Sequence, residues 1–478
     1  MWTAAVLSSY VLAAAAQGIY NPYPWANSAQ SQSWKTSHTH HWSSSNEVSN
    51  AESSPSTSYS SVSSSPSATT SQGVSGTGSS TTSRGSTSTG SSTTSTGSTG
   101  TGSSTTNPGS TSTGVASGGS SAIATPYSVI TPPLTTNWTY EVGTNPRTVP
   151  SLAGATVDMT SGRGGTYPRA NFLHDGSILG AYTGFSNGNN VLTLVRSTDK
   201  GAFWSLLGTA ATEASNANDL DNPYPLQLPS GRVLLAYRNH SKNATTGVYL
   251  YYRITISFSD DNGVTWSYLS TPASDPAGPN GNWEPFLRNA ADGSLQLYYS
   301  RENSADDQDS LMRTSTDAGK TWSTATIISG TGVTARDGML GVATISGSSL
   351  LAVFESEQDG LFTVNSITSF DDGKTWGNRQ RVYTPTGTNN NAGAPQIVTV
   401  GGTLCVSFMT DEDTQQHHWI IGADDKIITS GDGGATWGNK ITVFGVQSNW
   451  PAMLSLDRKS LLYMADFRGP KAQKINLD

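Results

Sequence analysis

The chain repeats one short pattern five times, and this repetition limits the fold more than any other feature of the sequence. The copies read STDKGAFW, SDDNGVTW, STDAGKTW, SFDDGKTW and SGDGGATW, and all fit Ser-x-Asp-x-Gly-x-x-Trp. They end at Trp204, Trp266, Trp322, Trp376 and Trp437, so by subtraction they recur every 54 to 62 residues. Aspartate can cap a tight turn, glycine allows a positive φ, and tryptophan buries a large apolar area. Such spacing indicates repeated supersecondary units and not one catalytic loop.

A second repeat alternates with the first and has the form of a β-hairpin. Its copies are YPRANFLHDGSILGAY, NPYPLQLPSGRVLLAYR, EPFLRNAADGSLQLYYSRE, GMLGVATISGSSLLAVFESE, APQIVTVGGTLCVSFMTDED and WPAMLSLDRKSLLYMADF. Each is an apolar strand, a polar or Gly-rich turn and a second strand. Six in-phase hairpins favour a six-bladed β-propeller over a β-sandwich. The first pattern resembles the Asp-box of sialidase-like propellers, which marks the hairpin between the two outer strands of a blade.

The sequence divides into four segments. Residues 1–16 have an apolar core followed by small residues, which predicts a signal peptide cleaved after Ala16 and hence a secreted protein. Residues 17–42 form an aromatic-rich tail, and residues 43–128 are a Ser/Thr/Gly-rich linker for which we expect a disordered stalk. The propeller is predicted over residues 129–478, closed by pairing of its last hairpin with residues near Thr139 to Thr148. Sequons at Asn137, Asn239 and Asn243 suit a glycosylated product.

Composition excludes several classes of protein. The net charge of −8 and the absence of basic stripes argue against nucleic-acid binding. The alternative for residues 1–16 is a short membrane anchor, but the apolar run is shorter than a bilayer span, so we expect no membrane association after cleavage. The single cysteine, Cys405, has no intramolecular partner and is expected to be buried on a strand. We expect no metal and no cofactor, and a monomer.

The residues that introduce the six hairpins are candidates for the functional site. In a propeller the innermost strands line the central channel, and the loops leading into them converge at one mouth. These loops and the ends of the second strands of the hairpins carry polar and aromatic residues that can bond or stack on a sugar. The residues predicted to bind substrate are Arg169, Asn222, Arg238, Trp283, Tyr299, Arg336, Asp337 and Trp450.

Several of these strings, among them NGNWEPFLRNAADGSLQLYYSREN, RDGMLG and LLAVFESE, resemble glycoside hydrolase family 93, the secreted exo-arabinanases of fungi. The resemblance covers the predicted propeller only. It implies a six-bladed propeller that releases arabinobiose from the non-reducing end of linear α-1,5-arabinan with retention of configuration. It places the general acid/base at Glu284 and the nucleophile at Glu355.

The local sequence is compatible with both roles. Glu284 stands between Trp283 and Pro285, an apolar setting that raises the pKa of a carboxyl group. Glu355 shares a strand position with Arg238 of an earlier repeat, and a nearby guanidinium would keep a nucleophile ionised. Glu357, two residues further on, is the alternate nucleophile because it points to the same side.

Two other functions remain open at this stage. An exo-sialidase would use a tyrosine nucleophile, for which Tyr463 is the candidate, and converging arginines that include Arg169. A carbohydrate-binding propeller without catalysis would need no acid pair, which the presence of Glu284 and Glu355 disfavours.

Overall fold

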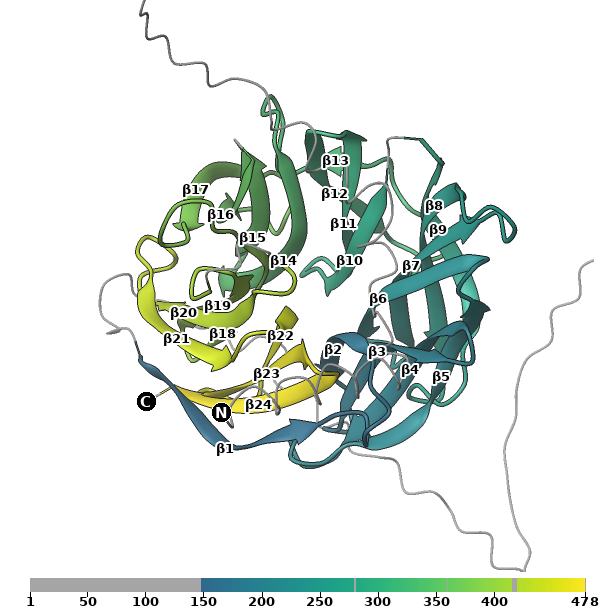
Figure 1. The fold of residues 1–478 in the computed structure, drawn as a ribbon, viewed down its shortest axis with the longest axis horizontal. Helices are drawn as coiled ribbons and strands as arrows, with labels where there is room; N and C mark the ends of the chain where they lie inside the picture. Colours follow the sequence, from purple (N-terminus) through teal and green to yellow (C-terminus); the bar gives the residue numbers. More distant parts are fainter. Residues whose placement is uncertain (1–147, 279–280, 359, 415–418, 478) are drawn as a thin grey trace, which may run out of the picture. The chain divides into compact units, whose positions relative to one another are not determined.

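The computed structural model describes residues 148–278, 281–358, 360–414 and 419–477. The predicted signal peptide, tail and linker and the sequon at Asn137 lie outside the described residues. Within the described residues the regular secondary structure consists of β-strands, which form sheets around a common axis (Figure 1). The prediction of an all-β, propeller-like fold is therefore confirmed. No helix capable of crossing a membrane is found in this part of the chain.

Five sheets make up the ring. The first contains β2 (Thr166–Phe172), β3 (Ile178–Ser186), β4 (Asn189–Ser197) and β5 (Ser205–Ala214). The second contains β6 (Asn218–Gln227), β7 (Val233–Lys242), β8 (Tyr249–Ser259) and β9 (Ser267–Pro276). Another contains β18 (Ala392–Val400), β19 (Thr403–Thr410), β20 (Asp424–Ser430) and β21 (Gly438–Phe444).

The largest sheet has eight strands. It contains β10 (Asn282–Asn289), β11 (Leu295–Ser304), β12 (Asp307–Ser315), β13 (Thr326–Ile327), β14 (Arg336–Ser346), β15 (Ser349–Gln358), β16 (Leu361–Ser369) and β17 (Gly377–Tyr383). Its two halves meet where β12 runs parallel to β14, and the register there is one pair, Gln308 with Arg336. Six separate four-stranded blades were predicted, and four such sheets are found. The remaining eight strands form a single sheet, because this residue pair joins its two halves.

The ends of the described chain close the ring. The fifth sheet has the order β1-β24-β23-β22, with β1 (Pro150–Asp158), β22 (Ser448–Ser455), β23 (Ser460–Phe467) and β24 (Pro470–Leu477). The antiparallel register runs from Pro150 opposite Leu477 to Asp158 opposite Lys471. Closure by an early strand was predicted, but the strand lies later than residues 139–148, and its partner is β24 and not the last hairpin itself.

The Ser-x-Asp-x-Gly-x-x-Trp copies are turn structures. In the copy between β16 and β17, Asp371 accepts hydrogen bonds from the Thr375 backbone N–H at 2.8 Å and from the Ser369 hydroxyl at 2.8 Å. Gly373 has a φ of 89°, and the Trp376 indole donates to its carbonyl at 3.0 Å. The turn joins the two outer strands of its unit, which confirms a structural role for the pattern.

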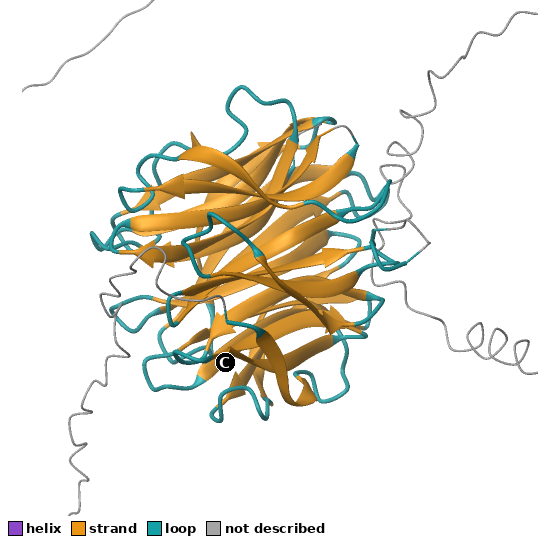
Figure 2. Cartoon of the chain, turned by 90° about the vertical axis from the view of Figure 1, so that its left-hand side faces the viewer, coloured by secondary structure: helices purple, strands orange, loops and turns teal. Residues whose placement is uncertain are grey.

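Side chains of neighbouring sheets pack into shared cores. One core joins the first two sheets through Leu179, Leu192, Leu220, Val233 and Leu235, all nearly inaccessible to solvent. Cys405 on β19 is fully buried in the core between the last two sheets, as predicted. Seen from the side, the strands run between two faces at which the loops gather (Figure 2).

Candidate active site

Six equivalent strands, β2, β6, β10, β14, β18 and β22, begin with the same irregularity. Within the first few residues of each strand, the register of pairing with the next strand shifts, as at a β-bulge. Each shift contains one non-glycine residue with left-handed φ: Tyr167 (54°), Asn222 (54°), Glu284 (43°), Met339 (52°), Ala394 (50°) and Trp450 (57°). A bulge redirects the side chain of its residue, and strained φ values of this kind cluster at functional sites.

The bulges of different sheets lie close together around the axis of the ring. Tyr167, Met339 and Ala394 belong to one apolar cluster with the buried side chain of Met409. The indole rings of Trp419 and Trp450 pack against this cluster and meet edge to face, with their centroids 6.4 Å apart. Bulge residues of several sheets therefore form one apolar cluster that includes aromatic rings.

Glu284 occupies the bulge of β10. Burial, followed by the negative charge of Glu355, raises the pKa of Glu284 to about 8, and the charge of Arg238 opposes this rise. Its Oε2 atom is buried without a hydrogen-bond partner among the described residues, and its carboxyl group also bonds the Ser300 side chain. This setting favours the protonated acid and agrees with the apolar environment expected from the sequence.

Glu355 lies on β15 with its side chain buried. Its Oε2 atom accepts a hydrogen bond from the Ala394 backbone N–H at 2.7 Å. Burial raises its pKa to about 7, while the bond from Ala394 and the charge of Arg336 act in the opposite direction. The expectation that Arg238 would hold this carboxyl ionised is wrong, because the guanidinium that lowers its pKa is Arg336.

The two buried glutamates interact, because the negative charge of Glu355 raises the pKa of Glu284. Burial raises the pKa of both carboxyl groups above the usual range, to about 8 for Glu284 and about 7 for Glu355. A carboxyl pair that holds one proton can supply one acid and one carboxylate at the same pH. The arrangement can therefore support acid/base chemistry combined with nucleophilic attack.

Arg238, whose charge acts on Glu284, is fixed by two aspartates. Its Nη2 atom lies 3.2 Å from Asp219 and 3.0 Å from Asp221, and its guanidinium stands 5.1 Å from the centroid of the Trp283 ring. Trp283 in turn packs edge to face on His240, with the centroids 4.8 Å apart. Arg238 therefore contributes a fixed positive charge beside Glu284.

Three other predicted residues near the bulges make hydrogen bonds or ion pairs with neighbouring protein groups. Arg169 is buried, donates to the Trp450 carbonyl at 3.0 Å and lies over the Tyr167 ring at 3.8 Å. Asn222 is buried at its bulge, and its backbone N–H donates to Asp221 at 2.7 Å. Asp337 is fully buried in a two-point ion pair with Arg379. Arg169 and Asp337 thus have structural partners in this structure.

Two predicted residues lie in the core and not at the bulges. Tyr299 packs between sheets with Leu297 and Leu311, and its hydroxyl accepts a bond from Arg313 at 3.2 Å. Tyr463 is fully buried, and its hydroxyl donates to the Lys426 carbonyl at 3.1 Å. Alternation along a strand sends these side chains away from the face that carries Glu355, so the structure does not bring them to the site.

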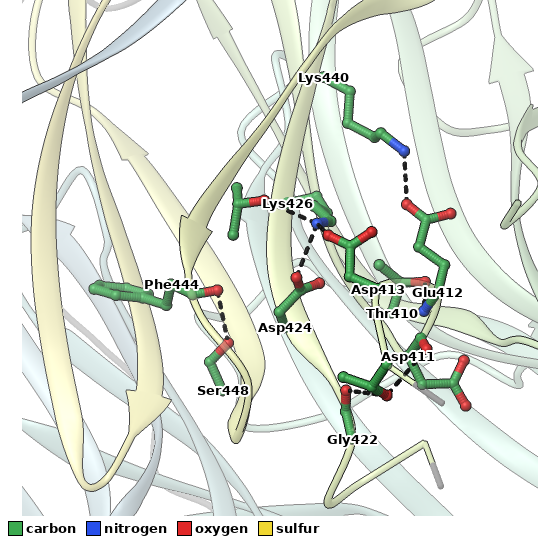
Figure 3. Close-up of polar contacts among 12 residues, drawn as sticks. Thr410, Asp411, Glu412, Asp413, Gly422, Asp424, Lys426, Lys440, Phe444 and Ser448 are labelled. Atoms are coloured by element: carbon green, nitrogen blue, oxygen red, sulfur yellow. Dashed lines mark hydrogen bonds and ion pairs between the residues drawn. The ribbon is translucent and has the colours of Figure 1, made fainter. Parts of the chain in front are cut away.

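A buried polar network supports the loops beside Glu355. Asp411 accepts a bond from the Asn391 backbone N–H at 2.6 Å, immediately before the bulge of β18. Figure 3 shows Lys426 between Asp424, at 2.8 Å, and Asp413. The carboxylates at these strand ends are therefore structural, and among the described residues no group of three or more His, Cys, Asp or Glu side chains is arranged to hold a metal ion.

Trp419 was not identified from the sequence. Its ring stacks on Phe362, with centroids 5.1 Å apart, and a Cβ atom added to Gly393 would come within 2.6 Å of both Trp419 and Glu355 Oε2. Trp419 lies in an irregular loop outside both repeats, so no spacing pointed to it. Ser300, which bonds the Glu284 carboxyl group, was likewise not among the predicted site residues.

A separate cavity of about 380 Å³ lies along the axis of the ring beyond the bulges. Inner-strand residues from all five sheets line it, among them Arg169, Tyr224, Phe286, Gln396 and Met453. Neither Glu284 nor Glu355 belongs to its lining. The cavity and the glutamate pair are thus different parts of the ring interior.

Comparison with known proteins agrees with this architecture. Residues 179–358 match the model of the BNR repeat-like domain. The fold is similar to the GH93 α-L-arabinofuranosidase of Fusarium graminearum in complex with arabinobiose, at 22% identity and a TM-score of 0.52, over 69% of this chain and 97% of that one. It is similar to the Penicillium chrysogenum α-L-arabinanase complexed with arabinobiose, at 21% identity and a TM-score of 0.51, with the same coverages.

A Dyadobacter fermentans protein of unknown function is also similar, at 14% identity and a TM-score of 0.51, over 70% of this chain and 99% of that one. No curated protein sequence matches the chain. At these identities the likeness concerns the fold. Residues 179–358 match the BNR repeat-like domain, and the described ring has the fold found in these solved structures.

Proposed function

We propose that the protein is a retaining, exo-acting glycoside hydrolase that releases arabinobiose from the non-reducing end of linear α-1,5-arabinan. The observation that carries this proposal is the pair of buried glutamates: Glu284 at the bulge of β10, and Glu355 held by the Ala394 N–H, with the charge of Glu355 acting on Glu284. In support of the substrate, two of the similar solved structures are described as complexes with arabinobiose.

In the proposed reaction each glutamate has one role per step. Glu284 donates its proton to the glycosidic oxygen while the Glu355 carboxylate attacks the anomeric carbon, which forms a glycosyl ester and releases the shortened polymer. Because Ala394 N–H holds Oε2 of Glu355, Oε1 is the attacking oxygen. Glu284, now ionised, then takes a proton from water, which hydrolyses the ester with net retention.

We also propose that the ring functions as a six-bladed propeller in which the eight-stranded sheet counts as two blades. Its halves share one residue pair, and each begins with an inner strand that carries the same bulge as the other sheets. We further propose that the protein is secreted after cleavage following Ala16 and acts as a monomer. Amino-terminal sequencing and size-exclusion chromatography of secreted protein test these two points.

The test of function is an incubation with linear arabinan, arabinoxylan and sialyllactose, followed by chromatography of the products. We expect arabinobiose from linear arabinan from the first minutes, and NMR of the fresh product should show the α-anomer. Arabinan that is bound but not cleaved would favour the carbohydrate-binding propeller. Release of sialic acid would favour a sialidase, although the burial of Tyr463 argues against that role.

A further inference from the structure

Behind the glutamate pair, one arginine joins two further glutamates. Arg336 is the first residue of β14, and its Nη2 atom donates to Glu302 Oε1 on β11 at 2.6 Å. Its Nε atom lies 3.7 Å from Glu357 Oε2 on β15. The side chains of these three residues are 12%, 17% and 14% exposed, so the charges are largely removed from solvent.

The same guanidinium is fixed by two uncharged acceptors. Nη1 donates to the Ala305 carbonyl at 2.9 Å, and Nη2 donates to Gln308 Oε1 at 3.1 Å. Gln308 is also the residue that pairs with Arg336 where the two halves of the eight-stranded sheet meet. Partners on three strands and in one loop thus hold Arg336 in one place.

Each glutamate of this triad is related to one member of the proposed catalytic pair. Glu357 follows Glu355 by two residues on β15, and Glu302 follows Ser300, which bonds Glu284, by two residues on β11. Side chains two residues apart on a strand point to the same side. The triad therefore lies alongside the pair, and its net charge of −1 would be −2 without the arginine.

We propose that Arg336 is a positioning residue: held between Glu302 and Glu357, it limits the negative charge beside the pair and so sets the pH range over which Glu284 and Glu355 together hold a single proton. This inference rests on the proposed function. It replaces direct substrate binding as the role of Arg336, and it assigns Glu357 to the support of Glu355 instead of to nucleophilic attack.

The charges around the pair agree with this role. The groups acting on Glu355 are the Ala394 N–H, Arg336 and Glu357, and the last of these raises its pKa. The groups acting on Glu284 are Glu355, Arg238, Ser300 and Glu302, and Glu302 again raises the pKa. Removal of the Arg336 charge takes one positive charge from between the two glutamates of the triad, in a poorly solvated region where charges interact strongly.

The test follows the titration of the pair directly. The chain has only nine glutamates, so carboxyl-labelled glutamate gives a countable set of ¹³C signals, assigned by Glu→Gln variants. Arg336→Gln should raise the pKa values of Glu355 and Glu284 by about half a unit or more, whereas Glu357→Gln should lower that of Glu355. If Arg336→Gln does not fold, Glu357→Gln and Glu302→Gln still test the sign of the effect.

The matched control is Arg288→Gln. Arg288 pairs with Asp372 near the other end of β10, and the two side chains are 15% and 10% exposed, close to the values of the triad. This variant should lose stability without moving either titration. Folded Arg336→Gln and Glu357→Gln variants whose titrations match the wild type would overturn the inference and leave Arg336 as a strut between the halves of the sheet.

Activity separates this inference from the proposed function. When kcat/KM on arabinan is plotted against pH, both the acidic and the basic flank of the curve should shift to higher pH in Arg336→Gln. The shift should match that of the NMR titrations. If Arg336→Gln cleaves arabinan and the pKa values of Glu284 and Glu355 are unchanged, the positioning role is contradicted but the proposed function is not. Moved titrations in a protein that cleaves no arabinan contradict the proposed function and leave the electrostatic coupling established.

Discussion

Glu284 combines three unfavourable circumstances in one residue: a left-handed φ of 43°, a poorly solvated carboxyl group and a neighbouring carboxylate. Each lowers the free energy of unfolding, and proteins retain such costs where function requires them. The same reasoning applies less strongly to Glu355, which gains a hydrogen bond from Ala394.

The first prediction tests the division of labour between the two glutamates. Glu355→Gly removes the nucleophile and should lower kcat on arabinan by about 10³-fold or more, and azide should restore turnover with a product of inverted configuration. Glu284→Ala leaves the nucleophile in place, so azide should rescue a substrate with a good leaving group and give a product of retained configuration. The measurement is NMR of the glycosyl azides.

The companion variant for this experiment is Glu357→Gly. Glu357 forms an ion pair with Arg336, so we expect the Glu357→Gly variant to have a shifted pH profile. We expect no azide product of inverted configuration from this variant. An inverted product from Glu357→Gly, and none from Glu355→Gly, would show that the nucleophile is the other glutamate of FESE.

The second prediction concerns stability and pH. The pKa of Glu284 rises from 4.5 to about 8 on folding, so the folded state binds its proton more tightly than the unfolded state. The stability that this proton provides is complete below about pH 4.5 and is lost as the pH rises to about 8. Glu284→Gln, which stays neutral, should therefore raise Tm by a few degrees at pH 8 and by little at pH 4.5. An equal shift at both pH values would exclude this proton linkage.

At the scale of residues, the sequence predicted the raised pKa of Glu284, whereas the catalytic roles of Glu284 and Glu355 stay predictions. The NWEPF and FESE strings indicated Glu284 and Glu355, and the apolar neighbours of Glu284 indicated its raised pKa. The partners of Arg238 and Arg336 could not be predicted, because each ion pair joins strands whose relative position depends on the packing of whole sheets. Tyr299, assigned to substrate binding, and the alternate nucleophile Tyr463 both lie in the core, at a strand position whose side chains alternate with those on the side of the site.

The bulged inner strand is the element that turns a regular sheet into a site. Five of the six bulge residues precede proline, which disfavours the right-handed helical region for the preceding residue, and the sixth, Met339, precedes Leu340. The repeated x-Pro was visible in the sequence at the start of five of the six hairpins. The left-handed φ of the residue before each proline was not visible, because that residue can also adopt an extended conformation.

The third prediction uses the bulge of β18. A Cβ atom on Gly393 would lie 2.6 Å from Glu355 Oε2 and 2.6 Å from Trp419, well inside van der Waals contact. Gly393→Ala should displace the Glu355 carboxyl and lower kcat by about 10-fold or more, because small displacements of reacting groups are costly. Gly377→Ala is the control, since nothing lies within 4 Å of its added Cβ. Equal activity in the two variants would contradict the position assigned to Glu355.

The whole ring is closed by a strand from one end of the described chain pairing with a strand from the other. The repeats in the sequence predicted the ring and the need for a closing strand. They did not locate that strand, since β1 belongs to neither repeat and has a mostly exposed surface. The joining of two units into an eight-stranded sheet depends on one residue pair, which no periodicity reports.

The fourth prediction separates the ring from the preceding segments. Deletion of residues 17–125 should leave the rate on soluble linear arabinan nearly unchanged, because the described strands form their own cores. Deletion extended through Asp158 removes the six residue pairs of β1 and should lower Tm by roughly 5 °C or more. A large loss of turnover in the shorter deletion would show that the tail or linker takes part in the reaction.

The position of β1 also has a consequence for association between copies. β1 is the outermost strand of its sheet, and most of its side chains are exposed, so its release breaks backbone hydrogen bonds but opens little of the core. The edge that β24 then offers accepts the β1 of another molecule as well as its own. High protein concentration or brief heating should thus favour strand-exchanged dimers, in which every sheet is complete and each ring is closed by its neighbour.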